Sequence, residues 1–150
     1  MREKLARIDA VQALTGQRLR VTFSDGWQVE LDLTRFIASF ASLAPLLEPE
    51  RFQHVALEEW GSGLTWDDEG PLSIAATTLY RLAAEQSGDD ARYFDAWMIC
   101  NGLSASQAAE SLGMTRRSII NYRTGSRPLP RYIRLACKGW EAEQANSRAA

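Results

Sequence analysis

Five arginines, whose guanidinium groups are well suited to pairing with phosphate, lie close together within residues 116–131. No Asp or Glu interrupts that stretch. Residues 91–140 hold eight Lys or Arg against two Asp or Glu, a net charge of +6, whereas residues 1–90 hold eight against 15, a net charge of −7. Such asymmetry indicates a nucleic-acid-binding part joined to a part with another task. The alternative is two neighbouring domains that attract one another.

Small residues and helix caps around these arginines predict a series of short helices. A first helix over residues 91–102 ends at Asn101-Gly102, and Ser104 with Gln107 forms a capping box for the second. Gly113 is expected to leave that helix with positive φ, and Thr115 to cap a third helix that ends at Gly125. A fourth helix follows at 131–140. The residues expected to face inward are Ala108, Ala109, Leu112, Ile119 and Tyr122.

A short helix, a turn containing glycine and a second short helix form the helix-turn-helix layout. Over about residues 92–140, and most clearly in "AAESLGMTRRSIINYRTGSRPLP", the chain resembles the lambda-repressor/Cro-like family of DNA-binding domains. It departs from that family at Ala105, where a polar, phosphate-contacting residue is common. The resemblance implies that the helix at about 115–124 enters the major groove of double-stranded DNA.

The resemblance also implies which side chains meet the DNA. Base edges would be contacted by Thr115, Arg116, Arg117, Ser118, Ile120 and Asn121, with arginine bonding guanine, asparagine bonding adenine and isoleucine meeting a thymine methyl. Phosphates would be contacted by Ser106, Arg123, Thr124, Arg127 and Arg131. Two alternatives stay open: the arginine pair is a solvated helix face, or the layout is kept only as a fold.

Residues 7–33 read as three antiparallel strands. In the hairpin "RLRVTFSDGWQVEL", a three-residue loop at 24–26 pairs Val21 with Val29 and Leu19 with Leu31, whereas a two-residue Asp-Gly turn would break the apolar face. We therefore expect the longer loop, with Gly26 at positive φ. The stretch "RIDAVQAL" before the hairpin supplies the third strand.

The remainder of the N-terminal part predicts a helix from Thr34, strands at 51–57 and 63–66, and a helix running from Leu72 to Gln86. The fold class is therefore α+β, with a small antiparallel sheet and helices followed by an all-α helix-turn-helix bundle. The polar break "QSGDDA" places the domain boundary, giving a domain over 1–86 and a second over 91–140. Residues 141–150 are expected to form a frayed polar tail.

The N-terminal part carries a resemblance of its own. The pattern "VTFSDGWQVELDL…PERFQHVAL…GLTWDDEGPLS", over about residues 8–80, resembles a bacterial domain-of-unknown-function family of small α+β proteins. Its members occur alone or fused to a Cro-like helix-turn-helix, and the neighbourhood of some to toxin genes makes an antitoxin role an alternative. The acidic domain is a poor partner for DNA, so we assign it to dimerisation, partner binding or ligand sensing.

Other candidate sites are weak. His54, Asp67, Asp68 and Glu69 form no recognisable triad or metal set, and we expect a satisfied strand histidine and a solvated acidic loop. Trp60 and Trp66 could line a small pocket, although core packing is the commoner role. Cys100 and Cys137 are expected to be buried free thiols. No signal peptide or membrane span is evident, which predicts a cytoplasmic bacterial protein.

These patterns predict a sequence-specific DNA-binding protein, a bacterial transcriptional regulator that acts as a homodimer without metal or cofactor and is not an enzyme. The first alternative is an antitoxin-like module whose acidic N-terminal domain binds a basic protein partner. The second, less favoured, is a hydrolase or metal enzyme that uses His54 and Asp67–Glu69.

Overall fold

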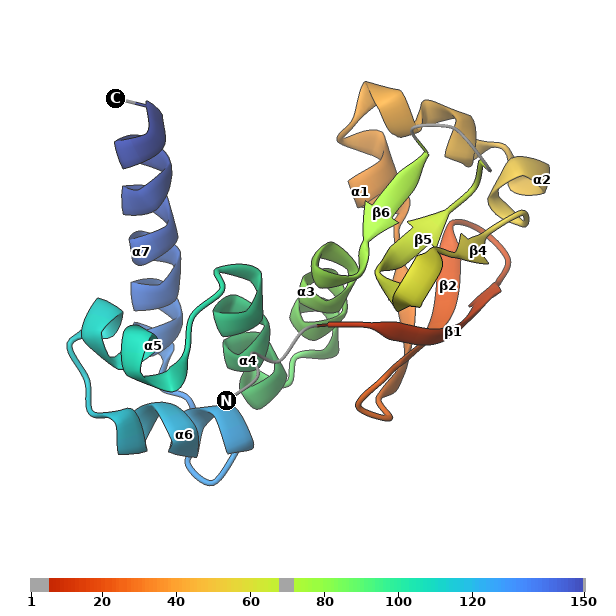
Figure 1. Ribbon diagram of the computed structural model, residues 1–150. Coiled ribbons are helices and arrows are strands. Elements are labelled where there is room, and N and C mark those ends of the chain that lie inside the picture. Colours follow the sequence, from red (N-terminus) through yellow and green to blue (C-terminus); the bar gives the residue numbers. More distant parts are fainter. Residues whose placement is uncertain (1–5, 68–71, 150) are drawn as a thin grey trace. The chain divides into compact units, whose positions relative to one another are not determined.

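The computed structural model describes residues 6–67 and 72–149. Within them the chain divides into two compact units, one ending at Gln86 and the other beginning at Ser87. The fold is mixed α+β: antiparallel strands and short helices make up the N-terminal unit, and the C-terminal unit is entirely helical. Figure 1 shows the elements of each unit.

The first sheet of the N-terminal unit is built from β1 (Ile8–Ala13), β2 (Arg18–Phe23) and β3 (Gln28–Asp32), paired antiparallel in that order. Leu19 lies opposite Leu31 and Val21 opposite Val29, which confirms the register predicted from the longer loop. Gly26 has φ +92°. The loop keeps the alternating apolar side chains on one face, because a one-residue slip would turn that face to water.

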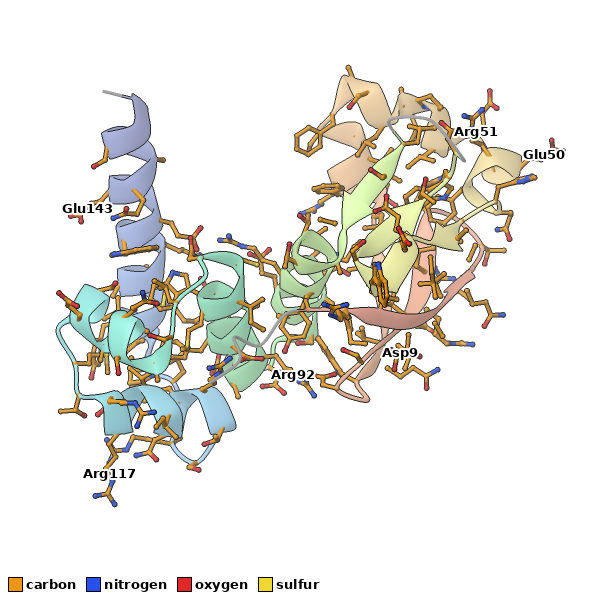
Figure 2. All side chains as sticks on the ribbon, in the orientation of Figure 1. Asp9, Glu50, Arg51, Arg92, Arg117 and Glu143 are labelled. Carbon is orange, nitrogen blue, oxygen red and sulfur yellow. The ribbon has the colours of Figure 1, made fainter. Side chains whose placement is uncertain are left out.

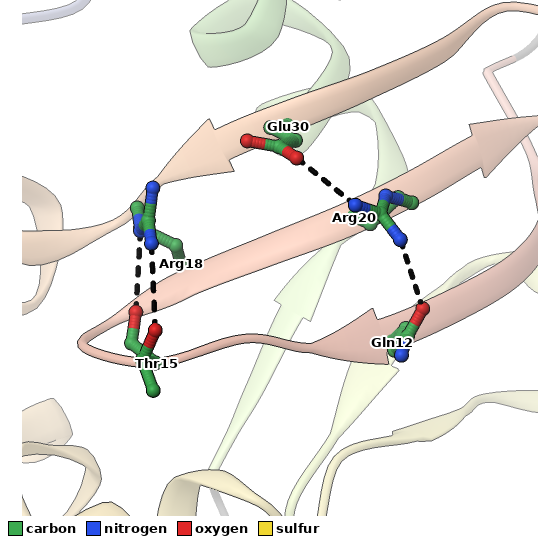
Figure 3. A network of polar contacts seen from close by, with 5 residues as sticks. All are labelled: Gln12, Thr15, Arg18, Arg20 and Glu30. Atoms are coloured by element: carbon green, nitrogen blue, oxygen red, sulfur yellow. Dashed lines mark hydrogen bonds and ion pairs between the residues drawn. The ribbon is translucent and has the colours of Figure 1, made fainter.

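The opposite face of this sheet is polar. Arg20, in the central strand, bonds Gln12 on β1 at 3.3 Å and Glu30 on β3 at 3.1 Å (Figure 3). Arg18 reaches the carbonyl and hydroxyl oxygens of Thr15 in the turn between β1 and β2. Arg20 therefore links the three strands, and Arg18 links β2 to the turn that precedes it.

After the sheet come α1 (Thr34–Ala38), the 3-10 helix η1 (Ala41–Leu47), α2 (Pro49–Phe52) and β4 (Ala56–Leu57). The helix predicted from Thr34 is confirmed at its start, but it ends at Ala38, and a separate 3-10 helix follows. The strand predicted over 51–57 is wrong in its first half, because Pro49 begins a helical turn that continues to Phe52. His54 consequently lies exposed in the turn before β4 and not in the middle of a strand.

The second sheet has the order β4-β5-β6, with β5 at Gly63–Thr65 and β6 at Ser73–Ala75, and the 3-10 helix η2 (Glu59–Gly61) precedes β5. The strand at 63–66 is confirmed, whereas a helix starting at Leu72 is wrong. Residues 73–75 pair with β5 before α3 (Ala76–Ser87) begins, so strand pairing overrides the helical spacing of the apolar residues. Tyr80 of α3 packs edge-on against Phe23.

The C-terminal unit contains α4 (Asp90–Cys100), α5 (Ala105–Leu112), α6 (Arg116–Thr124) and α7 (Arg131–Ala149). Its core is formed by residues of all four helices and of the segment before α7: Tyr93, Phe94, Trp97, Met98, Ala108, Ala109, Ile119, Tyr122, Leu129, Ile133 and Cys137. The segment predicted to be a frayed polar tail is helical as far as the structure describes it, since α7 continues through Ala149. Ala, Glu and Gln in that stretch favour helix.

No helix in the described ranges is long and apolar enough to cross a membrane. Cys137 is buried and Cys100 is half-buried, so the predicted burial is found for Cys137 only. Neither cysteine forms a disulfide within the described residues.

Candidate nucleic-acid interface

The helix α5 begins at a complete capping box. The backbone N–H of Ser104 donates to Gln107 Oε1 at 2.8 Å, and the N–H of Gln107 donates to Ser104 Oγ at 3.1 Å. These bonds satisfy two donors that the first turn of a helix leaves unpaired, and they fix the residue at which α5 starts. The capping box predicted from the sequence is confirmed.

The turn between α5 and α6 is tight. Gly113 adopts φ +67° and ψ +40°, and the N–H of Met114 donates to the carbonyl of Ala109 at 2.8 Å. Ala108 and Ala109 are buried, so no large side chain separates α5 from the helices packed against it. Ile119 and Tyr122 of α6 close the same core, as predicted. The two short helices are therefore joined by a tight turn and packed on one core, which is the layout that a helix-turn-helix requires.

The first turn of α6 is capped by two hydroxyl side chains. Thr115 Oγ1 accepts the backbone N–H of Ser118 at 3.1 Å and donates to Ser118 Oγ at 2.9 Å. Both residues were predicted to contact bases, and both already have roles in the cap. The cap orients the first turn of α6, which carries Arg116 and Arg117.

Arg116 and Arg117 are exposed, and no side-chain hydrogen bond or ion pair within the described residues engages either. Arg117 projects away from the body of α6 (Figure 2). The first turn holds no acidic residue, so two cations lie at the positive end of the helix dipole, which is unfavourable until an anion approaches. Ile120 is 38% exposed and Asn121 half-buried one turn later.

Arg123 differs from the other arginines of the segment. Its Nε donates to Asp95 Oδ1 at 2.6 Å, and only 26% of its side chain is exposed. The Nε bond joins α6 to α4, and the predicted phosphate contact of Arg123 stays a prediction. From the sequence, Asp95 counted only as one of the two acidic charges of residues 91–140. Its place amid the apolar residues of α4 was the available signal, because a buried carboxylate requires a partner.

The remaining predicted phosphate contacts fall into two groups. The Thr124 hydroxyl donates to the Ile120 carbonyl at 2.9 Å and lies 2.9 Å from Ser126 Oγ, so it is engaged at the end of α6. Ser106, Arg127 and Arg131 are exposed, and their side chains have no polar partner in the described ranges. Ser106 lies on α5, Arg127 follows α6, and Arg131 begins α7.

A second candidate site lies in the N-terminal unit. His54 and Asp67 line an open pocket of about 390 Å³ together with Glu48, Glu50, Arg51 and Trp66. Asp67 accepts a hydrogen bond from Arg51, and the indole of buried Trp66 donates to the Phe52 carbonyl at 3.0 Å. Trp60 does not line this pocket. Trp66 is buried, as the favoured core-packing role requires, whereas Trp60 is exposed. Asp68 and Glu69 lie outside the described residues.

The pocket brings His54 and Asp67 together, as the less favoured enzyme alternative requires. Among the residues described, no group of three or more His, Cys, Asp or Glu side chains could hold a metal ion. The described residues that line the pocket include no Ser or Cys, so these walls offer polar groups without a hydroxyl or thiol nucleophile.

Comparison with known families supplies the family of the N-terminal unit. Residues 8–85 match the model of a family described as "Protein of unknown function (DUF2442)". The chain belongs to this family. The match ends at the last residues of α3, so the helices that carry Arg116 and Arg117 lie beyond the DUF2442 region.

One solved structure resembles almost the whole of this DUF2442 chain. It is the crystal structure of a protein from Nitrosomonas europaea described there as a candidate DNA-binding protein. The two sequences are 40% identical, the match covers 95% of this chain and 91% of that one, and the TM-score is 0.62. A search among curated proteins found no significant match.

Proposed function

We propose that this chain is a sequence-specific DNA-binding protein that inserts α6 into the major groove and regulates transcription. The observation that carries the proposal is the pair of exposed, unengaged arginines on a capped helix within a rigid helix-turn-helix. Recognition helices of this layout read base edges with their N-terminal residues. The resemblance to a chain described as a candidate DNA-binding protein supports the same function.

We assign the DNA contacts according to whether each side chain is already bonded within the protein. Arg116 and Arg117 bond guanine, Asn121 bonds adenine, and Ile120 meets a thymine methyl, while Thr115 and Ser118 orient the helix start. Arg127 and Arg131 contact phosphates, and Ser106 adds a hydroxyl from α5. Arg123 is held by Asp95 through Nε, which leaves its Nη groups for the proposed phosphate contact.

A homodimer is part of the proposal. One short recognition helix reaches few base pairs, so two copies on half-sites about 34 Å apart, one turn of DNA, would double the contacts. The acidic N-terminal unit then acts in self-association, sensing or partner binding, and the chain carries out no catalytic step.

Selection of bound sequences from a random DNA pool, followed by a salt titration on the best site, tests the proposal. With about four to six phosphates contacted per subunit, log affinity should fall against log salt with a slope of about −4 or steeper. Replacement of Arg116 and Arg117 by alanine should abolish discrimination between selected and random DNA, while Arg131→Ala should weaken all sites alike.

The matched control is the double variant Arg20→Ala, Arg35→Ala, which removes the same charge from the N-terminal unit. It should leave the preference for the selected site unchanged. Association that is undetectable or independent of salt would reject DNA binding. Discrimination that survives loss of both Arg116 and Arg117 would reject α6 as the reading helix.

A further inference from the structure

The most exposed large apolar side chain described in this protein is that of Trp60, at 78%. It lies in η2, between β4 and β5. No ring stacking, cation–π contact or side-chain hydrogen bond engages its indole within the described ranges, and it lies apart from the pocket that contains Trp66. The indole therefore contributes little to the packing of its own unit.

The backbone at Trp60 is unfavourable for that residue type. Trp60 has φ +64° and Gly61 φ +66°, and the N–H of Ser62 donates to the Glu59 carbonyl at 3.3 Å. Two successive left-handed central residues give a type I′ turn, in which Asn, Asp or Gly is favoured at the first of the two positions. Trp60 is the only non-glycine residue at positive φ among those described. A bulky residue held there is strained.

The turn is fixed in place. Arg7 Nη1 donates to the Trp60 carbonyl at 3.1 Å, and the Glu58 N–H donates to the Gly63 carbonyl at 2.9 Å. Gly61 packs so closely on the backbone of Ile8 in β1 that a Cβ there would collide with the Ile8 carbonyl. These contacts hold the backbone of the turn in place and keep the indole at the surface. Retained strain around an exposed aromatic side chain indicates a role outside the unit's own fold.

The charges beside Trp60 define the partner. Glu58 and Glu59 precede it directly, and Asp9 follows the Ile8 against which the turn packs. Among the described residues, Arg7 is the cation that bonds the turn, through Nη1 to the Trp60 carbonyl. Residues 1–90 as a whole carry a net charge of −7. A guanidinium can lie on an indole face while its N–H groups bond nearby carboxylates.

We propose that the Trp60 turn, comprising Glu58–Ser62, is a docking site for an arginine-bearing segment of a protein partner. Trp60 is the anchor, since tryptophan is enriched among the residues that dominate protein interfaces. Glu58 and Glu59 select the cation. This site lies in the N-terminal unit and does not depend on DNA binding by α6.

The test is a titration of the full-length protein with a peptide of arginines separated by glycines, followed through the indole N–H resonances. The resonance missing from Trp60→Phe identifies Trp60. We expect this resonance to shift selectively and to saturate at submillimolar peptide. The same peptide with citrulline in place of arginine keeps shape and removes charge, and it should cause no shift.

Two variants separate binding from folding. Trp60→Asn should weaken peptide binding at least tenfold, yet raise Tm by a few degrees, because asparagine tolerates the left-handed conformation. Glu58→Gln with Glu59→Gln should also weaken binding. Phe40→Ala, which truncates another exposed aromatic side chain, is the matched control and should bind as the parent chain does.

Each contrary outcome overturns the proposal. These outcomes are no saturable shift at millimolar peptide, equal binding of the citrulline peptide, and unchanged binding by a folded Trp60→Asn variant. A shift centred on other indoles would also overturn it, because the peptide would then be held by the general acidity of the unit.

Discussion

At the scale of single residues, two arginines on the same short helix have opposite roles. Arg117 is exposed and without a side-chain partner in the described chain, whereas Arg123 donates to buried Asp95 at 2.6 Å. The difference follows from position around the helix, because Arg123 lies on the side of α6 that meets α4. A carboxylate only 4% exposed must be paired, so Asp95 makes Arg123 part of the fold.

Asp95→Ala should therefore destabilise the protein by about 3 kcal/mol, since it removes one partner of a largely buried ion pair. Urea denaturation measures this loss. The matched control is Glu30→Ala, which breaks the exposed pair with Arg20 and should cost less than about 1 kcal/mol. Equal losses for the two variants would mean that Asp95 is not needed to hold α6 against α4.

At the scale of elements, the turn between α5 and α6 decides where the arginine pair is presented. Gly113 adopts φ +67° at the end of α5, and Thr115 caps α6 two residues later. A residue with a Cβ would favour a different path, because left-handed backbone is costly for most side chains. The glycine therefore maintains the relation between α5 and the reading helix.

Gly113→Ala should destabilise the protein by about 1 kcal/mol through backbone strain alone, since its added Cβ would meet no atom within 4 Å. Gly139→Ala, in the middle of α7 and equally uncrowded, should instead stabilise it by about 0.5–1 kcal/mol. Thermal unfolding of both variants gives the comparison. Two changes of the same sign would contradict the role assigned to the turn.

At the scale of the whole molecule, an acidic unit and a basic unit each have their own core. The basic unit packs aromatic and aliphatic side chains of four helices around Trp97 and Ile119. Cys137 lies in this core, and burial, aided by the Glu141 carboxylate, raises the pKa of its thiol to about 12. At neutral pH the thiol is therefore protonated and weakly nucleophilic while the unit is folded.

A fragment of residues 87–150 should fold alone and protect Cys137 from alkylation. In a Cys100→Ser background, labelling at about pH 8 should be slow in the fragment and fast in urea, because only unfolding exposes the thiol. The full-length protein carrying the same substitution is the control. Labelling of the native fragment at the rate seen in urea would show that the helical unit depends on the N-terminal one.

Much of the local structure could be predicted from the sequence. The apolar alternation of β2 and β3 sets their register, because only one pairing brings the apolar side chains of both strands onto the same face. The capping box at Ser104 and the left-handed Gly113 follow from residue types within a few positions of each other. These features depend on short-range geometry, so the order of residues determines them. The positions of α5 and α6, and hence of Arg116 and Arg117, follow from them.

Only the tertiary structure determines which side chains are bonded to other parts of the protein. Residues 73–75 pair with β5 although the spacing of their apolar residues predicted a helix. Asp95 bonds Arg123, which lies 28 residues away in the sequence. The exposed indole of Trp60 on a strained turn likewise depended on how Gly61 packs against β1. Burial and long-range pairing arise from surfaces that meet only once the chain has folded, and residue spacing alone does not record them.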